Sequence, residues 1–185
     1  MKKLKSPPIT TQPSLDHLQR MFEEAKARIH DAGLLASSPN TASDSAAILR
    51  ILGFEILLKC AVLLCGQTPK KNHDYDCIWK TLPGKVRKDI QAAAATQMAG
   101  YADFSDLGKL LKTYQYVFEK ARYHYELYEN YTLDEQHELE VLWLQIGAPP
   151  KEAVVQYHPY ELLGLIAGLS SFIEACLRKL ACAAN

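Results

Sequence analysis

The sequence has no excess of charge of either sign. Its 185 residues include 21 Lys+Arg and 21 Asp+Glu, which gives a formal net charge of zero. A dedicated nucleic-acid binder usually carries a basic excess that displaces counterions from phosphates. The charge balance therefore argues against a strong non-specific nucleic-acid binder and leaves only a local basic patch open.

Cysteine is sparse and follows no binding pattern. The five cysteines are odd in number, form no CxxC motif and follow no recognisable secretory signal. We therefore expect reduced, buried thiols rather than a disulfide framework. The most apolar stretch, 48–66, contains Arg50, Glu55 and Lys59, too many charges for a membrane span of about 20 residues. The chain is predicted to be soluble and cytoplasmic.

Several catalytic signatures are missing. The sequence contains no glycine-rich phosphate loop, no Walker pattern and no GxSxG motif, so neither an ATPase nor a serine hydrolase is supported. His73 and Cys77 stand one helical turn apart, but two ligands do not make a metal site. We expect no metal and no cofactor.

Helical periodicity dominates what is present, and neither β-alternation nor an internal repeat persists. Residues 1–12 are predicted to be a flexible tail, and 13–185 a single domain. The expected helices are 15–31 with Gly33 as the stop, 45–65, 73–82, 83–98, 105–130, 133–147 and 158–183. This pattern predicts an all-α, up-and-down bundle of four long helices plus short accessory helices.

The expected helix over 105–130 carries the densest set of candidate side chains. Arg122 can pair with Glu119 and Glu126 on one stripe of the helix. His124 diverges from Arg122 by about 200° around the axis, so the two cannot readily grip one phosphate. Tyr125 is one of several tyrosines that either stack on RNA bases or fill helix contacts.

Glu55 and Lys59 raise a similar choice in the apolar second helix. They stand at i,i+4 and can pair with each other, or Glu55 can face Arg122 across the bundle. His73 and Asp74 open the short third helix, where Asn72 or Asp74 is a suitable N-cap. His73 and Asp74 are also candidate binding residues.

Three motifs together resemble the HEPN domain group of helical bundles: "GFEILLKCAVLLCG", "NHDYDCIWKTLP" and "FEKARYHYELYE". The resemblance spans roughly residues 46–129. It implies a helical bundle that usually dimerises. Many members are metal-independent ribonucleases of toxin–antitoxin or antiviral systems, and others are inactive binding modules.

The chain departs from the group's R-x(4–6)-H motif. Arg122 matches the arginine, but residues 127, 128 and 129 are Leu, Tyr and Glu. "RYHYE" looks like an arginine–glutamate variant of the group. On this resemblance the catalytic candidates are Arg122 on phosphate, Glu126 as general base and His124 entering across a dimer seam. The other interpretation is a structural ion-pair ladder.

Two functions follow as expectations. The first is an RNA-directed protein, a ribonuclease toxin or defence component with a non-standard active site. The second is a non-catalytic dimeric module that binds a protein partner, such as an antitoxin, or a nucleotide. The missing histidine favours the second function.

Overall fold

The computed structural model describes residues 13–38, 45–121, 128–147 and 156–184, and all regular structure in these ranges is helical. The elements are α1 (Leu15–Ser37), α2 (Ser45–Leu64), α3 (Tyr75–Thr81), α4 (Gly84–Gln97), α5 (Leu107–Tyr116), the π-helical turn η1 (Val117–Ala121), α7 (Leu133–Gln145) and α8 (Pro159–Ala184). The predicted all-α bundle is confirmed.

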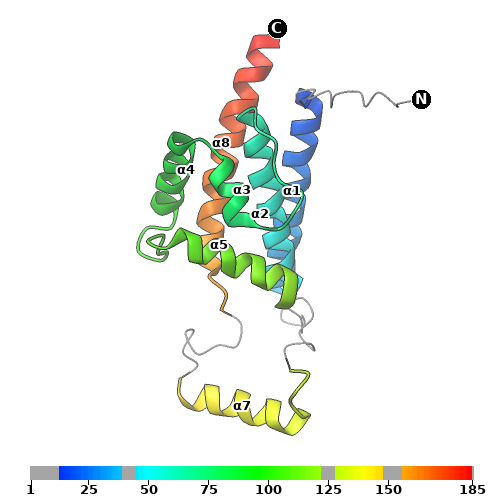
Figure 1. The fold of residues 1–185 in the computed structure, drawn as a ribbon, viewed down its shortest axis with the longest axis vertical. Helices are drawn as coiled ribbons and strands as arrows, with labels where there is room; N and C mark the ends of the chain where they lie inside the picture. Colours follow the sequence, from blue (N-terminus) through cyan, green and yellow to red (C-terminus); the bar gives the residue numbers. More distant parts are fainter. Residues whose placement is uncertain (1–12, 39–44, 122–127, 148–155, 185) are drawn as a thin grey trace, which may run out of the picture.

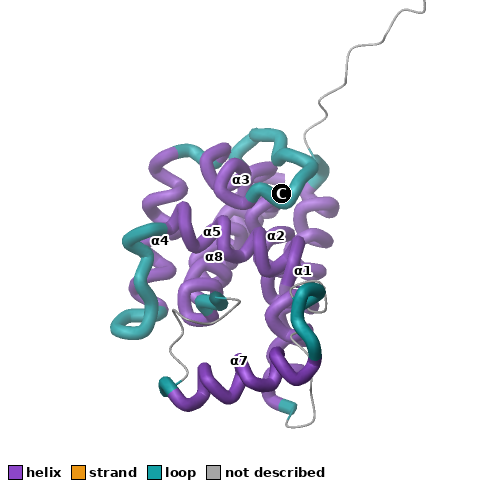
Figure 2. The backbone as a smooth tube through the Cα atoms, turned by 60° about the horizontal axis from the view of Figure 1, so that its bottom comes forward, coloured by secondary structure: helices purple, strands orange, loops and turns teal. Residues whose placement is uncertain are grey.

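The bundle is organised around α2 (Figure 1). α1 and α2 run antiparallel along one side, α8 lies beside both of them, and α4 packs against α8. The short helices α3 and α5 cross in front of α2 and α8 (Figures 1 and 2). Because α2 is buried on nearly all sides, its apolar character all round is required by its position.

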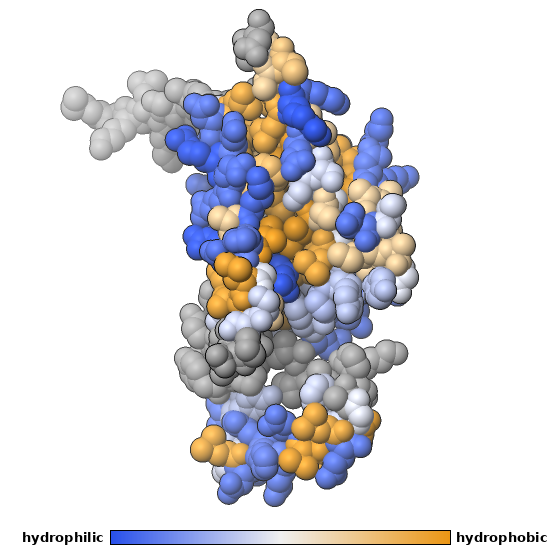
Figure 3. Space-filling model, turned by 180° about the vertical axis from the view of Figure 1, so that it is seen from behind, coloured by the Kyte–Doolittle hydropathy of each residue, from blue (hydrophilic) through white to orange (hydrophobic). Residues whose placement is uncertain are grey.

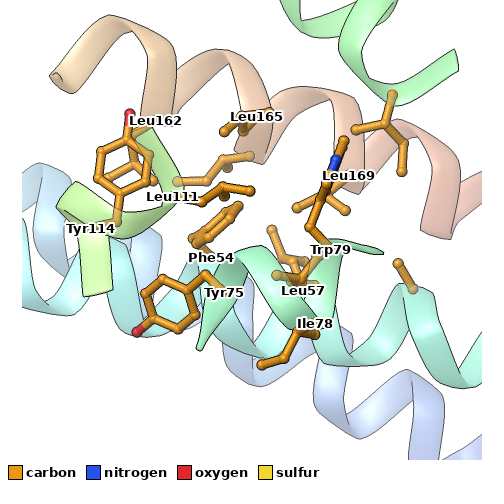
Figure 4. Packing of buried hydrophobic residues seen from close by; sticks show 14 of the residues in the cluster. Phe54, Leu57, Tyr75, Ile78, Trp79, Leu111, Tyr114, Leu162, Leu165 and Leu169 are labelled. Carbon is orange, nitrogen blue, oxygen red and sulfur yellow. The ribbon is translucent and has the colours of Figure 1, made fainter. Parts of the chain in front are cut away.

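Aromatic side chains fill the layer between α2, α3 and α5 (Figure 4). The ring of Phe54 meets Tyr75 edge-on at 5.7 Å and Tyr114 at 6.0 Å between centroids. The Tyr114 hydroxyl donates to the backbone carbonyl of His158 at 2.9 Å, which satisfies its polar end. This layer holds α3 and α5 at fixed positions on α2.

The helix α7 lies apart from the bundle (Figures 1 and 2). It is locally well specified, because Thr132 and Glu135 form a reciprocal capping box. None of its residues is buried, and Leu133, Leu139, Leu142, Leu144 and Ile146 are all exposed. Apolar surface on α7 is visible in the space-filling view (Figure 3). Among the described residues, these large apolar side chains are therefore left uncovered by the bundle.

Within the described residues, Pro159–Ala183 is the one helix long and apolar enough, by length and composition, to cross a membrane. Its buried leucines, Leu162, Leu165 and Leu169, lie in the bundle core. Packing against α2 and α4 therefore accounts for much of this helix's apolar character.

Two predicted helix boundaries were wrong. α1 continues through Gly33 to Ser37 and ends where Ser38 turns extended, because a glycine without positive φ weakens a helix but does not end it. The predicted α-helix over 105–130 changes to a π-helical turn at Val117. The stops at Gly66 and Gly147 were right, and both glycines have the positive φ that such stops require.

The prediction of uniformly buried thiols was also too broad. All five cysteines are free, but only Cys60 is buried and Cys182 is exposed. Burial raises the pKa of the Cys60 thiol to about 12, so this residue serves as a core side chain.

Candidate functional site

A buried carboxylate with three donors marks the candidate site. Glu55, on α2, is 5% exposed and accepts from Lys59 Nζ at 2.6 Å through Oε1. Its other oxygen, Oε2, lies 2.8 Å from His73 Nδ1 and accepts from the Tyr75 hydroxyl at 2.8 Å. We call Glu55, Lys59, His73 and Tyr75 the Glu55 cluster.

Local structure places each member of the Glu55 cluster. Glu55 and Lys59 share one face of α2 at i,i+4 spacing. Gly66 ends α2 in the left-handed region, and the chain returns to begin α3 after Asp74. The Asp74 carboxylate accepts from the Cys77 backbone N–H at 2.9 Å. This cap fixes the first turn of α3 and so holds His73 and Tyr75 over Glu55.

Hydrogen bonding keeps Glu55 ionised. Burial alone would raise the pKa of this carboxyl, but the hydrogen bonds from Lys59, His73 and Tyr75 outweigh burial and hold the pKa below its ordinary value of 4.5. An ionised carboxylate only accepts hydrogen bonds, so the hydrogen between the two side chains belongs to His73 Nδ1. In the neutral imidazole, Nε2 is then the nitrogen that can take up a proton.

The imidazole is both held and accessible. The His73 side chain is 43% exposed, whereas the Glu55 side chain is 6% exposed. On its other side the ring contacts Phe118 of η1, with 4.8 Å between ring centroids. π-Helical turns are frequent at functional sites, and the one that follows α5 carries the aromatic ring that packs on His73. The arrangement suits a histidine that exchanges protons with a bound ligand.

A polar groove lies between α3 and α5. Some of its lining residues are close in sequence to members of the Glu55 cluster. We call this feature the α3–α5 groove; its volume is about 610 Å³ and it is lined by Asp76, Lys80, Asp106, Gly108, Lys109, Lys112, Thr113, Tyr116 and Gln156. Glu55 and His73 are not among its lining residues. The groove and the cluster are therefore neighbouring features rather than one cavity.

The structure brings together some of the predicted residues. Glu55, Lys59 and His73 meet, and the Glu55–Lys59 pair, one of the two alternatives for Glu55, is present. Asp74 acts as a helix cap. Arg122, His124, Tyr125 and Glu126 lie outside the described residues, so their predicted roles stay predictions.

Sequence reasoning did not single out Tyr75 or Phe118 as parts of this site. Tyr75, Ile78 and Trp79 form an apolar i,i+3,i+4 stripe that predicts burial of the ring. A buried tyrosine needs a partner for its hydroxyl, and Glu55 is the one carboxylate in the apolar stretch 48–66. The contact of Phe118 with His73 had no comparable sequence signal.

The described residues hold no group of three or more His, Cys, Asp and Glu side chains placed to bind a metal.

Comparisons of the chain with family models, with curated proteins and with solved structures found no match.

Proposed function

We propose that this chain is a HEPN-like, RNA-directed protein of the cytoplasm, a ribonuclease toxin or defence component whose active site is non-standard. One observation carries the proposal: a partly exposed histidine, His73, is held by the buried, ionised Glu55 at 2.8 Å. A carboxylate that orients an imidazole is a common arrangement for general acid–base catalysis.

The reaction that this arrangement supports is attack of an RNA 2′-OH on the adjacent phosphate. His73 Nε2 removes the 2′-OH proton, and the 2′-oxygen forms a bond to phosphorus while the bond from phosphorus to the 5′-oxygen of the next nucleotide breaks. The leaving 5′-oxygen takes a proton from water, and His73 returns its proton to the solvent. The products are a 2′,3′-cyclic phosphate and a 5′-OH end. Arg122 is kept as the phosphate-binding residue on sequence grounds, since guanidinium suits phosphate; it directly follows η1, which contacts His73.

Cleavage of total tRNA in EDTA tests this function. Wild-type protein is expected to cleave, and His73→Gln is expected to be slower by about 100-fold or more, the usual contribution of a proton-transfer group. Arg122→Ala is also expected to be slower, because it removes the guanidinium that binds the phosphate. His30→Gln, which changes an exposed histidine on α1, is the matched control and should cleave like wild type. Intact RNA with the wild type would contradict the nuclease function, and full activity of His73→Gln would place proton transfer elsewhere.

A second function, a non-catalytic module that binds a protein partner or a nucleotide, is favoured by a different feature of the same cluster. Lys59 and Tyr75 already donate to both oxygens of Glu55. The cluster is thus complete as a structural network that satisfies a buried charge. Intact RNA with every protein in the cleavage assay would favour this second function.

A homodimer belongs to the same proposal, and α7 supports it. Leu139 and Leu142 are 40% and 56% exposed, and Ile146, the C-cap of α7, is 62% exposed. The three residues follow the i, i+3 and i+7 spacing of one helix face. This spacing is typical of a helix that lays its apolar face in a partner's groove. An isolated helix of this length is marginal in water, so a covering surface would stabilise it.

The double substitution Leu139→Asp, Leu142→Asp tests the dimer by light scattering after size-exclusion chromatography. We expect wild type to elute with the mass of a dimer and the variant with the mass of a monomer. Each leucine buried in the dimer interface contributes about 1.5–3 kcal/mol. Losing both should raise the dissociation constant of the dimer above micromolar protein concentrations. Leu34→Asp changes an exposed leucine of α1 and should remain dimeric. A monomeric wild type would refute the dimer.

A further inference from the structure

We infer that the α3–α5 groove binds the phosphate groups of a single-stranded RNA segment. This inference rests on the proposed function and names where the strand beside the reacting phosphate is held. The groove's volume, about 610 Å³, falls within the usual range of about 300–1,000 Å³ for ligand sites.

The groove presents cations whose charge is available. Three lysines, Lys80, Lys109 and Lys112, line it from two helices. Lys80 is bound to Asp76 at 2.6 Å, and the pKa of its ammonium is raised by that hydrogen bond. Within the described ranges, neither Lys109 nor Lys112 has a carboxylate partner. Two exposed ammonium groups at i,i+3 on one face of α5 are thus free to bind anions.

The two carboxylates in the groove are already engaged. Asp76 is paired with Lys80, and the Asp106 carboxylate caps α5 by accepting from the Lys109 backbone N–H at 2.9 Å. The Asp106 carboxylate keeps its charge, so the lining residues carry three lysine charges against two aspartate charges. The chain has zero formal net charge, but the groove has an excess of one positive charge, and the lysines left unpaired among the described residues lie on α5.

The groove also offers groups that can contact the base and the ribose of a nucleotide. Tyr116, 45% exposed, lines the groove on the last turn of α5, and an exposed tyrosine ring can stack on a base of any identity. The Thr113 hydroxyl, one residue after Lys112, can donate to a phosphate or a ribose.

The chain connects the groove to the Glu55 cluster at two points. Tyr116 lies two residues before Phe118, whose ring contacts His73. Asp76 lies three residues after His73 at the start of α3. In this inference, a strand whose reacting phosphate lies at His73 continues toward α5, where its neighbouring phosphates bind Lys109 and Lys112.

Fluorescence anisotropy with a 5′-fluorescein-labelled 2′-O-methyl octauridylate tests this inference. The probe has no free 2′-OH, so its binding is measured without cleavage. The double variant Lys109→Gln, Lys112→Gln is expected to raise the Kd for this probe by about tenfold at low salt. The slope of log affinity against log salt should fall in magnitude by about 1.4, since each phosphate contact on a single strand contributes about 0.7. Lys85→Gln, Lys88→Gln, with the same spacing on the exposed face of α4, is the control and should leave both values unchanged.

The outcomes separate this inference from the proposed function. Equal binding by wild type and the α5 variant, or no binding by wild type, overturns the inference, whether or not tRNA is cleaved. Binding that is lost only in the α5 variant supports it, even if no RNA is cleaved and the nuclease function fails.

Discussion

Glu55→Ala is expected to lower the free energy of unfolding by about 3–5 kcal/mol, the usual loss when one partner of a buried ion pair is removed. The substitution leaves Lys59 and the Tyr75 hydroxyl without their acceptor in a layer where Glu55 is 5% exposed. For a chain of this size the melting temperature should fall by roughly 10 °C. Thermal and urea denaturation followed by circular dichroism measure the change.

Glu23→Ala is the matched control, because it removes a carboxylate from an exposed pair with Lys26 at 3.1 Å. Such pairs contribute little, so its effect should stay within about 0.5 kcal/mol. A loss below about 1 kcal/mol for Glu55→Ala would contradict the assignment of Glu55 as a stabilising hub of the cluster.

The contribution of Glu55 should also depend on pH in one direction. Its pKa in the folded protein lies below the ordinary value of 4.5. The stability that the carboxylate adds is therefore fully present above pH 4.5 and is lost as the pH falls through the folded-state pKa. In urea titrations between pH 7 and pH 3, the gap between wild type and Glu55→Gln should narrow below pH 4.5. A gap that widens on acidification would reverse the sign of the pKa shift.

Gly168→Ala is expected to lower the free energy of unfolding by about 1–3 kcal/mol through overpacking. A Cβ on Gly168 would lie 2.5 Å from the backbone carbonyl oxygen of Ile90 and 3.2 Å from Ile90 Cγ2. Because the nearest atom belongs to the backbone of α4, relief requires α4 and α8 to separate. Urea denaturation should show a lower midpoint with an unchanged m-value.

Gly33→Ala should have the opposite sign. Gly33 also lies inside a helix, but a Cβ there meets nothing within 4 Å. The alanine then stabilises by about 0.5–1 kcal/mol through helix propensity alone. Destabilisation by Gly33→Ala, or stabilisation by Gly168→Ala, would show that the space around each glycine does not determine the change in stability.

Local sequence patterns predicted most of the helices and part of the candidate site. Gly66 and Gly147 end helices because each needs a positive φ that other residues rarely adopt. Asp74 was one of two predicted caps, with Asn72, because a short polar side chain reaches backbone N–H groups of the first turn, and the structure shows Asp74 as the cap. The Glu55–Lys59 pair was predictable for the same reason: it depends only on i,i+4 geometry within one helix.

Contacts between distant segments decided the rest. His73 lies over Glu55, 18 residues earlier, because the return of the chain to α3 and the packing of Tyr75 on Phe54 place it there. The lack of space for a side chain at Gly168 is caused by the backbone of α4. The exposure of α7 is likewise a result of tertiary structure, because no residue of this helix is buried. Periodicity and capping report interactions within about one helical turn. Sequence therefore determined which residues are helical and where most helices end, whereas tertiary packing alone determined which histidine meets the buried carboxylate.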